Sequence, residues 1–285
     1  MVYLLPFQTG IVTEEHCKLM CRLRFLFPFL LVLAQCATSP LDRRQVVLYS
    51  DAEMALQGEQ AYRQIQSEIP VTPNSSESVY VQCVADYIIE ALAEPMRSSM
   101  AWEVTVFDDE QANAFALPGG KIGVYNGLLD VAFNQHQLAA VMAHEVGHVL
   151  ANHSNERASQ STLRNVGLTA ARVLGASDVT IEAIDYGTQL GLFLPFNRTQ
   201  ESEADGIGIM LMAEAGFDPE QSIALWENMA AQGGSRPPEF LSTHPSPESR
   251  MADLRARLPE ARAARTAALN RGMVPDCVPG VIGQG

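Results

Sequence analysis

The chain has 285 residues, and 47% of them are apolar, so it is long enough to bury a substantial hydrophobic core. Acidic residues outnumber Lys and Arg by 33 to 19 and are spread along the chain, which gives a formal charge of −14. Because a protein that binds nucleic acid needs clustered basic residues, we expect no nucleic-acid partner, and we interpret the acidity as a source of solubility.

The first 37 residues have the pattern of an export signal. Arg22 and Arg24 precede an apolar run that ends at Ala34 and is too short to be a membrane-spanning helix. Met20 stands immediately before this pattern, and we interpret it as an alternative start of the protein. The prediction is a signal or targeting segment over residues 1–37, followed by one domain over residues 38–285.

Cys36 lies at the end of this predicted signal. The sequence Leu33-Ala-Gln-Cys36 resembles the lipobox of bacterial lipoproteins, in which the cysteine is acylated. Gln35 departs from that pattern, which prefers a small residue before the cysteine. Lipidation of Cys36 and ordinary signal cleavage nearby therefore remain two alternatives.

Two further cysteines, Cys83 and Cys277, lie in the domain that follows. They either form one disulfide, which would attach the C-terminal segment to the first half of the domain, or are two unrelated buried thiols. An export signal implies an oxidising compartment, so we predict the disulfide.

The first elements of the domain are predicted to be helical. Residues 39–45 indicate a polar leader, and apolar residues at helical spacing predict helices over 51–68 and 78–93. A cluster of turn-forming residues over 70–76 separates the two helices.

From Trp102 the apolar period changes to two. This pattern predicts strands over 104–107, 114–117 and 122–125, and the turn Pro118-Gly119-Gly120 joins the last two. We therefore expect a small antiparallel sheet with a hairpin.

The rest of the chain is predicted to be helical. The clearest helices cover 136–153 and 201–215, with Gly216 ending the second one and Asp218-Pro219 beginning another. Charged residues interrupt segment 161–196 too often for a membrane span. An Ala- and Arg-rich stretch over 255–265 indicates a solvated surface helix.

The sequence His144-Glu145-Val-Gly-His148 lies in the middle of the helix predicted over 136–153. Residues four apart on a helix are separated by about 6 Å on one face, so His144 and His148 can bind one metal ion. Glu145 follows one step round the helix, where its carboxylate can hydrogen-bond a metal-bound water. We therefore predict His144 and His148 as zinc ligands and Glu145 as the general base of a hydrolase.

A catalytic zinc ion needs a third protein ligand and an open position for water. Glu201 and Asp205 share one face of the next predicted helix, whereas Glu203 points elsewhere. We predict that Glu201 is the third ligand and that Asp205 accepts a hydrogen bond from a ligating histidine, which would fix its tautomer. The alternative is that these acidic residues only form the solvent-exposed start of a helix and bind no metal.

Three ordered motifs carry a resemblance to a known family. They are Asn113-Ala-Phe-Ala-Leu-Pro-Gly-Gly120, Leu138-Ala-Ala-Val-Met-Ala-His-Glu-Val-Gly-His148 and Leu194-Pro-Phe-Asn-Arg-Thr-Gln-Glu-Ser-Glu-Ala-Asp205. Over residues 51–258 the chain resembles the zinc metalloendopeptidases that include the CAAX prenyl proteases, the mitochondrial inner-membrane stress protease and bacterial periplasmic quality-control proteases. The soluble bacterial members are the most similar, because the chain resembles the catalytic domain without spanning helices.

The resemblance implies an α+β, mainly α-helical gluzincin-type fold with an active-site helix and a small sheet. It implies one zinc ion per chain and a periplasmic location, with an outer-membrane tether if Cys36 carries lipid. The implied substrates are unfolded or misassembled envelope proteins, and prenylated substrates are not expected. The sequence leaves the oligomeric state open.

The edge of the predicted sheet is suited to an extended substrate. We predict that Asn113, Ala114, Phe115 and Ala116 bind it through main-chain hydrogen bonds, the alternative being an ordinary hairpin. His244 matches the family's C-terminal His-Pro motif, which implies that it stabilises the oxyanion or occupies the open zinc position. Its alternative is a helix-capping loop.

Two other readings of the chain remain open. One is a periplasmic chaperone or assembly factor that uses the cleft with latent or minor proteolysis. The other is a structural zinc protein, which fits poorly because structural sites are usually closed by four Cys or His ligands. Asn152, His153 and Arg198 are interpreted as near the site in sequence only.

Overall fold

The computed structural model describes residues 36–73, 75–175, 177, 197–231, 240, 244 and 247–278. The predicted export signal up to residue 35, and the neighbours of His244 in its motif, lie outside these residues. The elements are β1 (Cys36–Thr38), β2 (Arg44–Val46), α2 (Asp51–Glu68), α3 (Ser76–Glu90), α4 (Met96–Ser99), β3 (Glu103–Phe107), β4 (Ala114–Leu117), β5 (Lys121–Tyr125), the 3-10 helix η2 (Asn126–Asp130), α5 (Gln135–Leu150), α6 (His153–Val173), α8 (Arg198–Glu214), α9 (Gln221–Ala231) and α11 (Pro247–Asn270).

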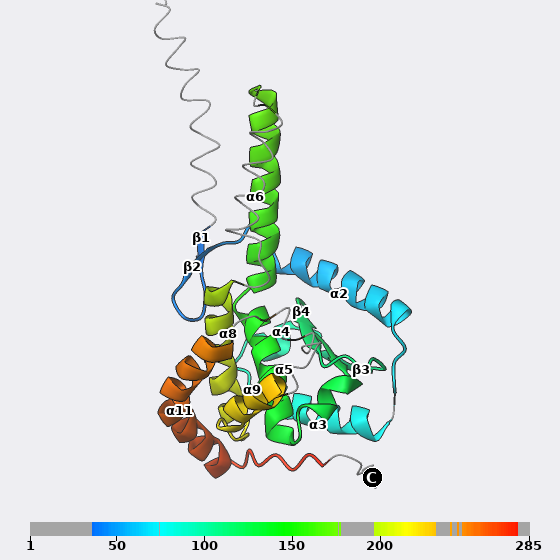
Figure 1. Cartoon of the computed structure of the whole chain (residues 1–285), viewed down its shortest axis with the longest axis vertical. Coiled ribbons are helices and arrows are strands. Elements are labelled where there is room, and N and C mark those ends of the chain that lie inside the picture. Colours follow the sequence, from blue (N-terminus) through cyan, green and yellow to red (C-terminus); the bar gives the residue numbers. More distant parts are fainter. Residues whose placement is uncertain are drawn as a thin grey trace, which may run out of the picture.

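Helix α5 is the central element of the described fold. Helices α3, α8 and α9 and strand β4 pack on it, and α11 packs on the outer side of α8. Every residue of α5 from Gln137 to Val149 is buried. Figure 1 shows α6 leaving this body as a long helix, with the β1–β2 hairpin beside its base. The prediction of a mainly helical α+β fold is confirmed.

Polar caps determine where the two central helices begin. The Asn134 side chain accepts hydrogen bonds from the main-chain N–H groups of His136 and Gln137, which starts α5. Asn197 and Gln200 form a capping box at the start of α8. Gly216 follows α8 in the left-handed conformation, with φ of 87°, and ends the helix as predicted.

The helix predicted over 136–153 is two helices. Helix α5 ends at Leu150, and Asn152 has a left-handed backbone with φ of 54°. His153 therefore starts α6 in a new direction rather than continuing α5. Asn tolerates this conformation better than most residues, which explains why the break falls there.

The sheet is mixed rather than wholly antiparallel. Strands β4 and β5 form the predicted antiparallel hairpin, but β5 lies between β4 and β3 and pairs with β3 in parallel. This order leaves β4 at one edge of the sheet. Tyr125 donates its main-chain N–H to the Asn113 carbonyl. Because pairing alternates along a strand, the main-chain groups of Ala114 and Ala116 point away from β5.

The segment 39–45 is part of a hairpin rather than a loose polar leader. Strands β1 and β2 pair antiparallel. Ser39, which lies between the two strands, and Gln45, which lies within β2, are both buried. The prediction was wrong because the polar side chains of this segment pair with buried carboxylates, whereas a polar sequence usually indicates solvent exposure.

Helix α11 is longer and less solvated than predicted. It includes the Ala- and Arg-rich stretch 255–265, but its buried side chains Leu254, Ala261 and Ala268 face the body of the domain. One face of α11 therefore belongs to the core, and its arginines lie on the remaining surface or reach inward.

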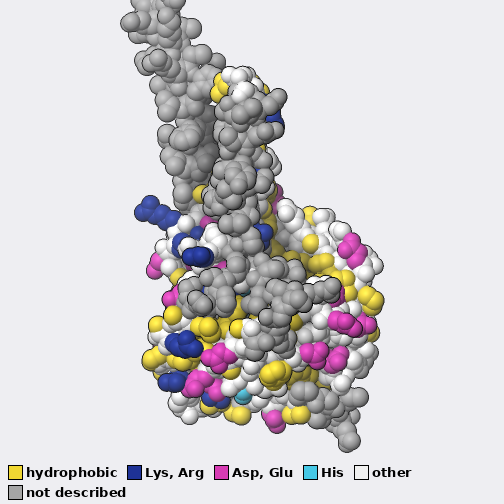
Figure 2. All heavy atoms as spheres, in the orientation of Figure 1, with side chains coloured by type: hydrophobic (Ala, Val, Ile, Leu, Met, Phe, Trp, Pro, Cys, Tyr) yellow, Lys and Arg dark blue, Asp and Glu magenta, His cyan; other side chains and the backbone are white. Residues whose placement is uncertain are grey.

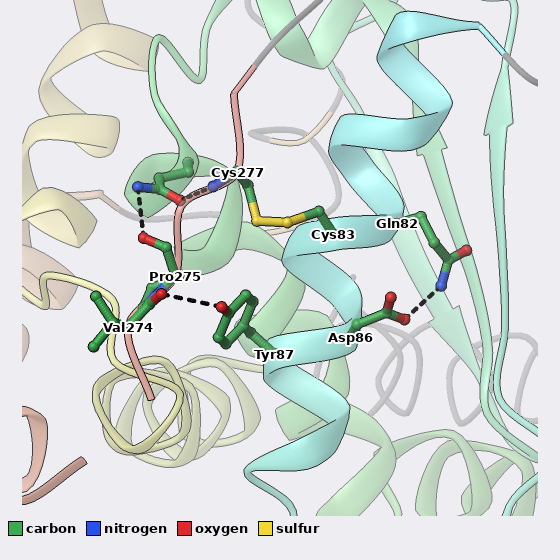
Figure 3. Close-up of a disulfide and its surroundings, with 8 residues drawn as sticks. Gln82, Cys83, Asp86, Tyr87, Val274, Pro275 and Cys277 are labelled. Carbon is green, nitrogen blue, oxygen red and sulfur yellow. Dashed lines mark hydrogen bonds between the residues drawn. A yellow bond between two sulfur atoms is a disulfide. The ribbon is translucent and has the colours of Figure 1, made fainter. Parts of the chain in front are cut away.

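A disulfide joins Cys83 of α3 to Cys277 in the C-terminal segment, with 5.8 Å between their Cα atoms. The Tyr87 hydroxyl donates to the Val274 carbonyl on the same side of α3, as Figure 3 shows. The Gln135 side chain accepts from the Cys277 main-chain N–H. The C-terminal segment is thus held against both α3 and the start of α5.

The visible face of the molecule has acidic side chains scattered over the body rather than gathered in one patch (Figure 2). No concentrated acidic patch is therefore seen on this face. Among the described residues, no helix combines the length and the apolar character that a membrane crossing requires.

Candidate metal centre

Two helices bring the predicted ligands together. His144 and His148 lie one turn apart on α5, and Glu201 lies in the first turn of α8. Glycines allow the two helices to approach closely, because a Cβ at Gly208 would lie 3.0 Å from the His144 backbone and one at Gly147 would lie 2.9 Å from the Ala204 carbonyl oxygen. All three ligand side chains are buried.

The distances between the ligand atoms fit one tetrahedral ion. The Nε2 atoms of His144 and His148 are 3.0 Å apart, and the Glu201 carboxylate oxygens lie 3.5 and 3.4 Å from them. Zinc bonds of about 2.0–2.1 Å predict tetrahedral ligand separations of roughly 3.3 Å. The two histidines and the glutamate therefore surround a point at which a zinc ion would fit.

His244 joins the same cluster. Its Nδ1 atom lies 3.2 Å from His144 Nε2 and 3.0 Å from Glu201 Oε1, so four ligand groups lie within 4.8 Å of one another. Its Nε2 atom lies 3.3 Å from the Glu145 carboxylate. The ring stacks on Phe240, at 4.4 Å between ring centroids, which holds it in the site. The residues on which the helix-capping alternative depends, 245 and 246, lie outside the described part of the chain.

Asp205 lies beside His144. Its Oδ1 atom is 3.0 Å from His144 Nδ1, which leaves Nε2 directed at the other ligands. Arg250 of α11 also holds Asp205, through Nε and Nη2 at 2.6 Å each, and its Nη1 lies 2.7 Å from Glu201. The guanidinium carbon lies 4.1 Å from the centroid of the Trp226 ring. Sequence reasoning missed Arg250, because only the packing of α11 on α8 brings it to the site.

Glu145 lies between the ligand cluster and strand β4. Its Oε1 atom is buried and accepts no hydrogen bond from the described part of the chain. The main-chain N–H of Ala116 interacts with its carboxylate. The polar neighbour given for this oxygen is His244 Nε2, at 3.3 Å. A buried carboxylate oxygen next to a ligand cluster is suited to bind a polar hydrogen of a small molecule such as water.

The prediction that His153 is near the site in sequence only was wrong, because its side chain contacts a predicted metal ligand. Its Nδ1 atom lies 2.8 Å from His148 Nδ1, and its Nε2 atom lies 3.1 Å from Glu203. On a continuous helix, five residues would rotate His153 away from the face of His148 by about 140°. The left-handed backbone of Asn152 reverses this expectation, and the sequence offered no pattern that predicts it.

The electrostatics of the site divide its carboxylates into two kinds. Burial raises the pKa of Glu145. Burial alone would also raise the pKa of Glu201, but hydrogen bonds with His144, His148 and His244 hold it below its usual value. Glu201 is thus an anion that suits a cation, whereas Glu145 is a stronger base than an ordinary carboxylate.

Burial and neighbouring charges also set the pKa values of Asp205 and of the two histidines of α5. Burial would raise the pKa of Asp205, but Arg250 and then His144 lower it to about 2. Burial and Arg250 would lower the pKa of His144, but hydrogen bonds to Asp205 and Glu201 raise it to about 9. Burial lowers the pKa of His148 well below its usual value. A metal ion would therefore displace a proton from His144 and meet a neutral His148.

The chain is similar in sequence to known peptidases. The sequence model of peptidase family M48 matches residues 75–258. The mitochondrial metalloendopeptidase OMA1 of Schizosaccharomyces pombe is 37% identical over 217 residues, which are 75% of this chain and 61% of that protein. The beta-barrel assembly-enhancing protease of Escherichia coli K12 is 37% identical over 169 residues, covering 55% of this chain and 34% of that protein. The corresponding protease of Yersinia pestis is 31% identical and covers 76% of this chain and 46% of its own length. The chain thus spans less than two thirds of the length of these relatives.

Proposed function

Because the chain belongs to peptidase family M48, we propose that it is a zinc-dependent endopeptidase that hydrolyses peptide bonds of unfolded or misassembled envelope proteins. In this proposal His144, His148 and Glu201 hold the metal, and Glu145 is the general base. The observation that carries the proposal is the convergence of these buried ligands at tetrahedral spacing beside the buried carboxylate of Glu145.

The chemistry follows from the donor set. When bound, a zinc ion would act as a Lewis acid that polarises the scissile carbonyl and lowers the pKa of a water molecule at the site toward about 7. The Glu145 carboxylate then takes a proton from the attacking water and delivers it to the nitrogen of the leaving amine. Asp205 holds His144 with its Nε2 lone pair toward the metal, and Arg250 compensates the negative charge of Asp205 and Glu201.

Strand β4 supplies a binding edge for the substrate. The main-chain groups of Ala114 and Ala116 face away from β5, and the Ala116 N–H lies against the general base. An extended polypeptide that pairs with this edge, between Asn113 and Ala116, would lie across the metal centre. Phe115 instead directs its main-chain groups to β5. Main-chain pairing reads little sequence and is available only in an unfolded segment, which supports unfolded substrates.

A cavity next to this edge also suits unfolded chains. It has a volume of about 250 Å³ and lies between α2, α4 and the end of α5, beside the turn that follows β4. Met54, Met96 and Met100 line it together with the metal ligand His148. Methionine side chains adapt to apolar groups of different shapes, so the cavity would accept an apolar side chain that a folded substrate keeps buried.

The proposed location is the bacterial periplasm. It is supported by the export-signal pattern before residue 37 and by the disulfide between Cys83 and Cys277, since disulfides persist in oxidising compartments. A lipid on Cys36 would tether the enzyme to the outer membrane.

The experiment that tests this function compares the purified protein with its Glu145→Gln variant for zinc content and for cleavage of unfolded casein. We expect one zinc ion per chain in both proteins and cleavage only by the wild type, because the substitution removes the base and leaves the ligands. A His148→Ala variant serves as the matched control and should lose the metal as well.

Cleavage that persists in the Glu145→Gln variant would contradict the assigned base. Zinc binding without cleavage by the wild type would favour the alternative of a chaperone or assembly factor. In that case the Glu145→Gln variant should still suppress aggregation of an unfolded envelope protein, because the β4 edge is unchanged.

A further inference from the structure

We propose that the β1–β2 hairpin is a functional part of the metal centre and that Arg43, Glu203 and His153 are positioning residues for the ligand His148. The inference rests on the proposed metal binding. It assigns a role to a segment that precedes the region matched by the family and that contains no metal ligand.

The hairpin supplies the positive charge that two buried carboxylates need. Arg43 donates from Nε to Glu203 at 2.6 Å and from Nη1 and Nη2 to the two oxygens of Glu156 at 2.7 Å each. Ser39 of the same hairpin donates a hydrogen bond to Glu203. The side chains of Glu203 and Glu156 are only 4% and 6% exposed. Removing Arg43 would leave both carboxylates buried without a cation, which is unfavourable.

A chain of hydrogen bonds leads from the hairpin through Glu203 and His153 to His148, and with a neutral His153 it fits one arrangement of protons. An ionised Glu203 can only accept, so its 3.1 Å contact requires His153 to carry a proton on Nε2. The Nδ1 atom of a neutral His153 is then an acceptor, and its 2.8 Å contact requires the proton of His148 to be on Nδ1. This tautomer leaves the Nε2 lone pair of His148 directed at His144 and Glu201, where the metal would bind.

Contacts other than those of Arg43 hold the segment that follows β2 against α6. The Leu48 main-chain N–H donates to the Ser159 hydroxyl at 2.8 Å, and the Asn155 side chain donates to the Tyr49 carbonyl at 2.7 Å. These two hydrogen bonds involve neither Arg43 nor the carboxylates of Glu203 and Glu156. An Arg43 variant should therefore keep the hairpin docked while it disturbs the chain to His148, which separates a positioning role from simple attachment.

The test uses the full chain with Arg43→Gln and, as the matched control, Arg44→Gln. Arg44 is the next residue on the same hairpin, carries the same charge and is exposed. Zinc affinity is measured by competition with a chelator of known affinity, and the cobalt-loaded proteins are compared by visible absorption, which reports ligand geometry. Thermal unfolding of the metal-free proteins checks the fold.

We expect Arg43→Gln to weaken zinc binding about 10-fold or more and to alter the cobalt spectrum, as loss of outer-shell partners does in metal sites. Arg44→Gln should match the wild type, and Arg43→Lys should restore part of the affinity, because a Lys ammonium can still pair with one of the two carboxylates. Equal zinc affinity and equal spectra for all variants, with zinc-dependent cleavage intact, would overturn this inference alone. Absence of zinc binding by the wild type would overturn the proposed function as well.

Discussion

The imidazole of His244 lies at the fourth corner of the ligand cluster, between Glu201 and Glu145. A tetrahedral zinc ion with four protein ligands has no position left for the attacking water. With His244 as the fourth ligand, the site would therefore be closed to water. We predict that His244→Ala increases the initial rate of casein cleavage several-fold and lowers zinc affinity, because one ligand is removed and a position for water is opened.

The opposite change in rate would support a different role for His244. If its imidazole stabilises the oxyanion, cleavage by His244→Ala should fall by about 100-fold or more while zinc affinity stays constant. Measuring zinc content beside the rate distinguishes the two roles, and Glu145→Gln supplies the background rate. Phe240→Leu, which removes the stacked ring but keeps the imidazole, should change the rate in the same direction as His244→Ala but by less.

Individual site residues differ in how far the sequence could predict them. His144, His148, Glu201 and Asp205 follow from the helical period, since each pair lies one turn apart on one helix. The structure brings these side chains together, but the positions of Arg250 and His153 required information that periodicity does not contain. The position of Arg250 depends on the packing of α11 against α8, and the position of His153 depends on the backbone break at Asn152.

At the scale of elements, α2 packs directly on the turn that ends strand β4. A Cβ placed on Gly58 of α2 would lie 2.1 Å from the Pro118 carbonyl oxygen, so any larger residue must displace the turn. We predict that Gly58→Ala lowers the free energy of unfolding by about 1–3 kcal/mol through overpacking. Because the turn continues β4, the variant should also raise the KM for casein more than it lowers kcat.

A second helical glycine provides the control for this substitution. Gly167 of α6 is exposed, and a Cβ there would have no neighbour within 4 Å. Gly167→Ala should therefore raise the free energy of unfolding by up to about 1 kcal/mol, as expected for Ala in a helix. Chemical denaturation of the two variants gives opposite signs if the contact between α2 and the turn is the cause. Equal changes in the free energy of unfolding for the two substitutions would show that this contact is not the cause.

The helices were predictable because apolar spacing and capping residues act locally. The helix over 51–68 and the end of α8 at Gly216 are examples in which sequence and structure agree. Strand order is a long-range property, so the parallel pairing of β3 with β5 could not be inferred from alternation. The β1–β2 hairpin was missed for a related reason, since its polar residues pair with carboxylates more than 100 positions away.

At the scale of the whole molecule, the disulfide joins two parts of the chain that are 194 residues apart in sequence. It fastens the segment after α11 to α3, and α11 in turn carries Arg250 into the metal centre. Closing so long a loop restricts the unfolded chain strongly, so the covalent link should contribute to stability even though its cysteines lie outside the ligand cluster.

We predict that the double variant Cys83→Ser, Cys277→Ser unfolds with a free energy about 2–5 kcal/mol lower than the wild type. Urea denaturation with a metal chelator present measures this, because bound zinc would otherwise stabilise both proteins by mass action. Tyr87→Phe is the control. It removes only the hydrogen bond to Val274 and should cost about 1 kcal/mol or less. If the double variant and Tyr87→Phe lose equal stability, the non-covalent contacts hold the C-terminal segment on their own. If a reductant lowers the stability of the wild type to that of the double variant, the link itself is responsible.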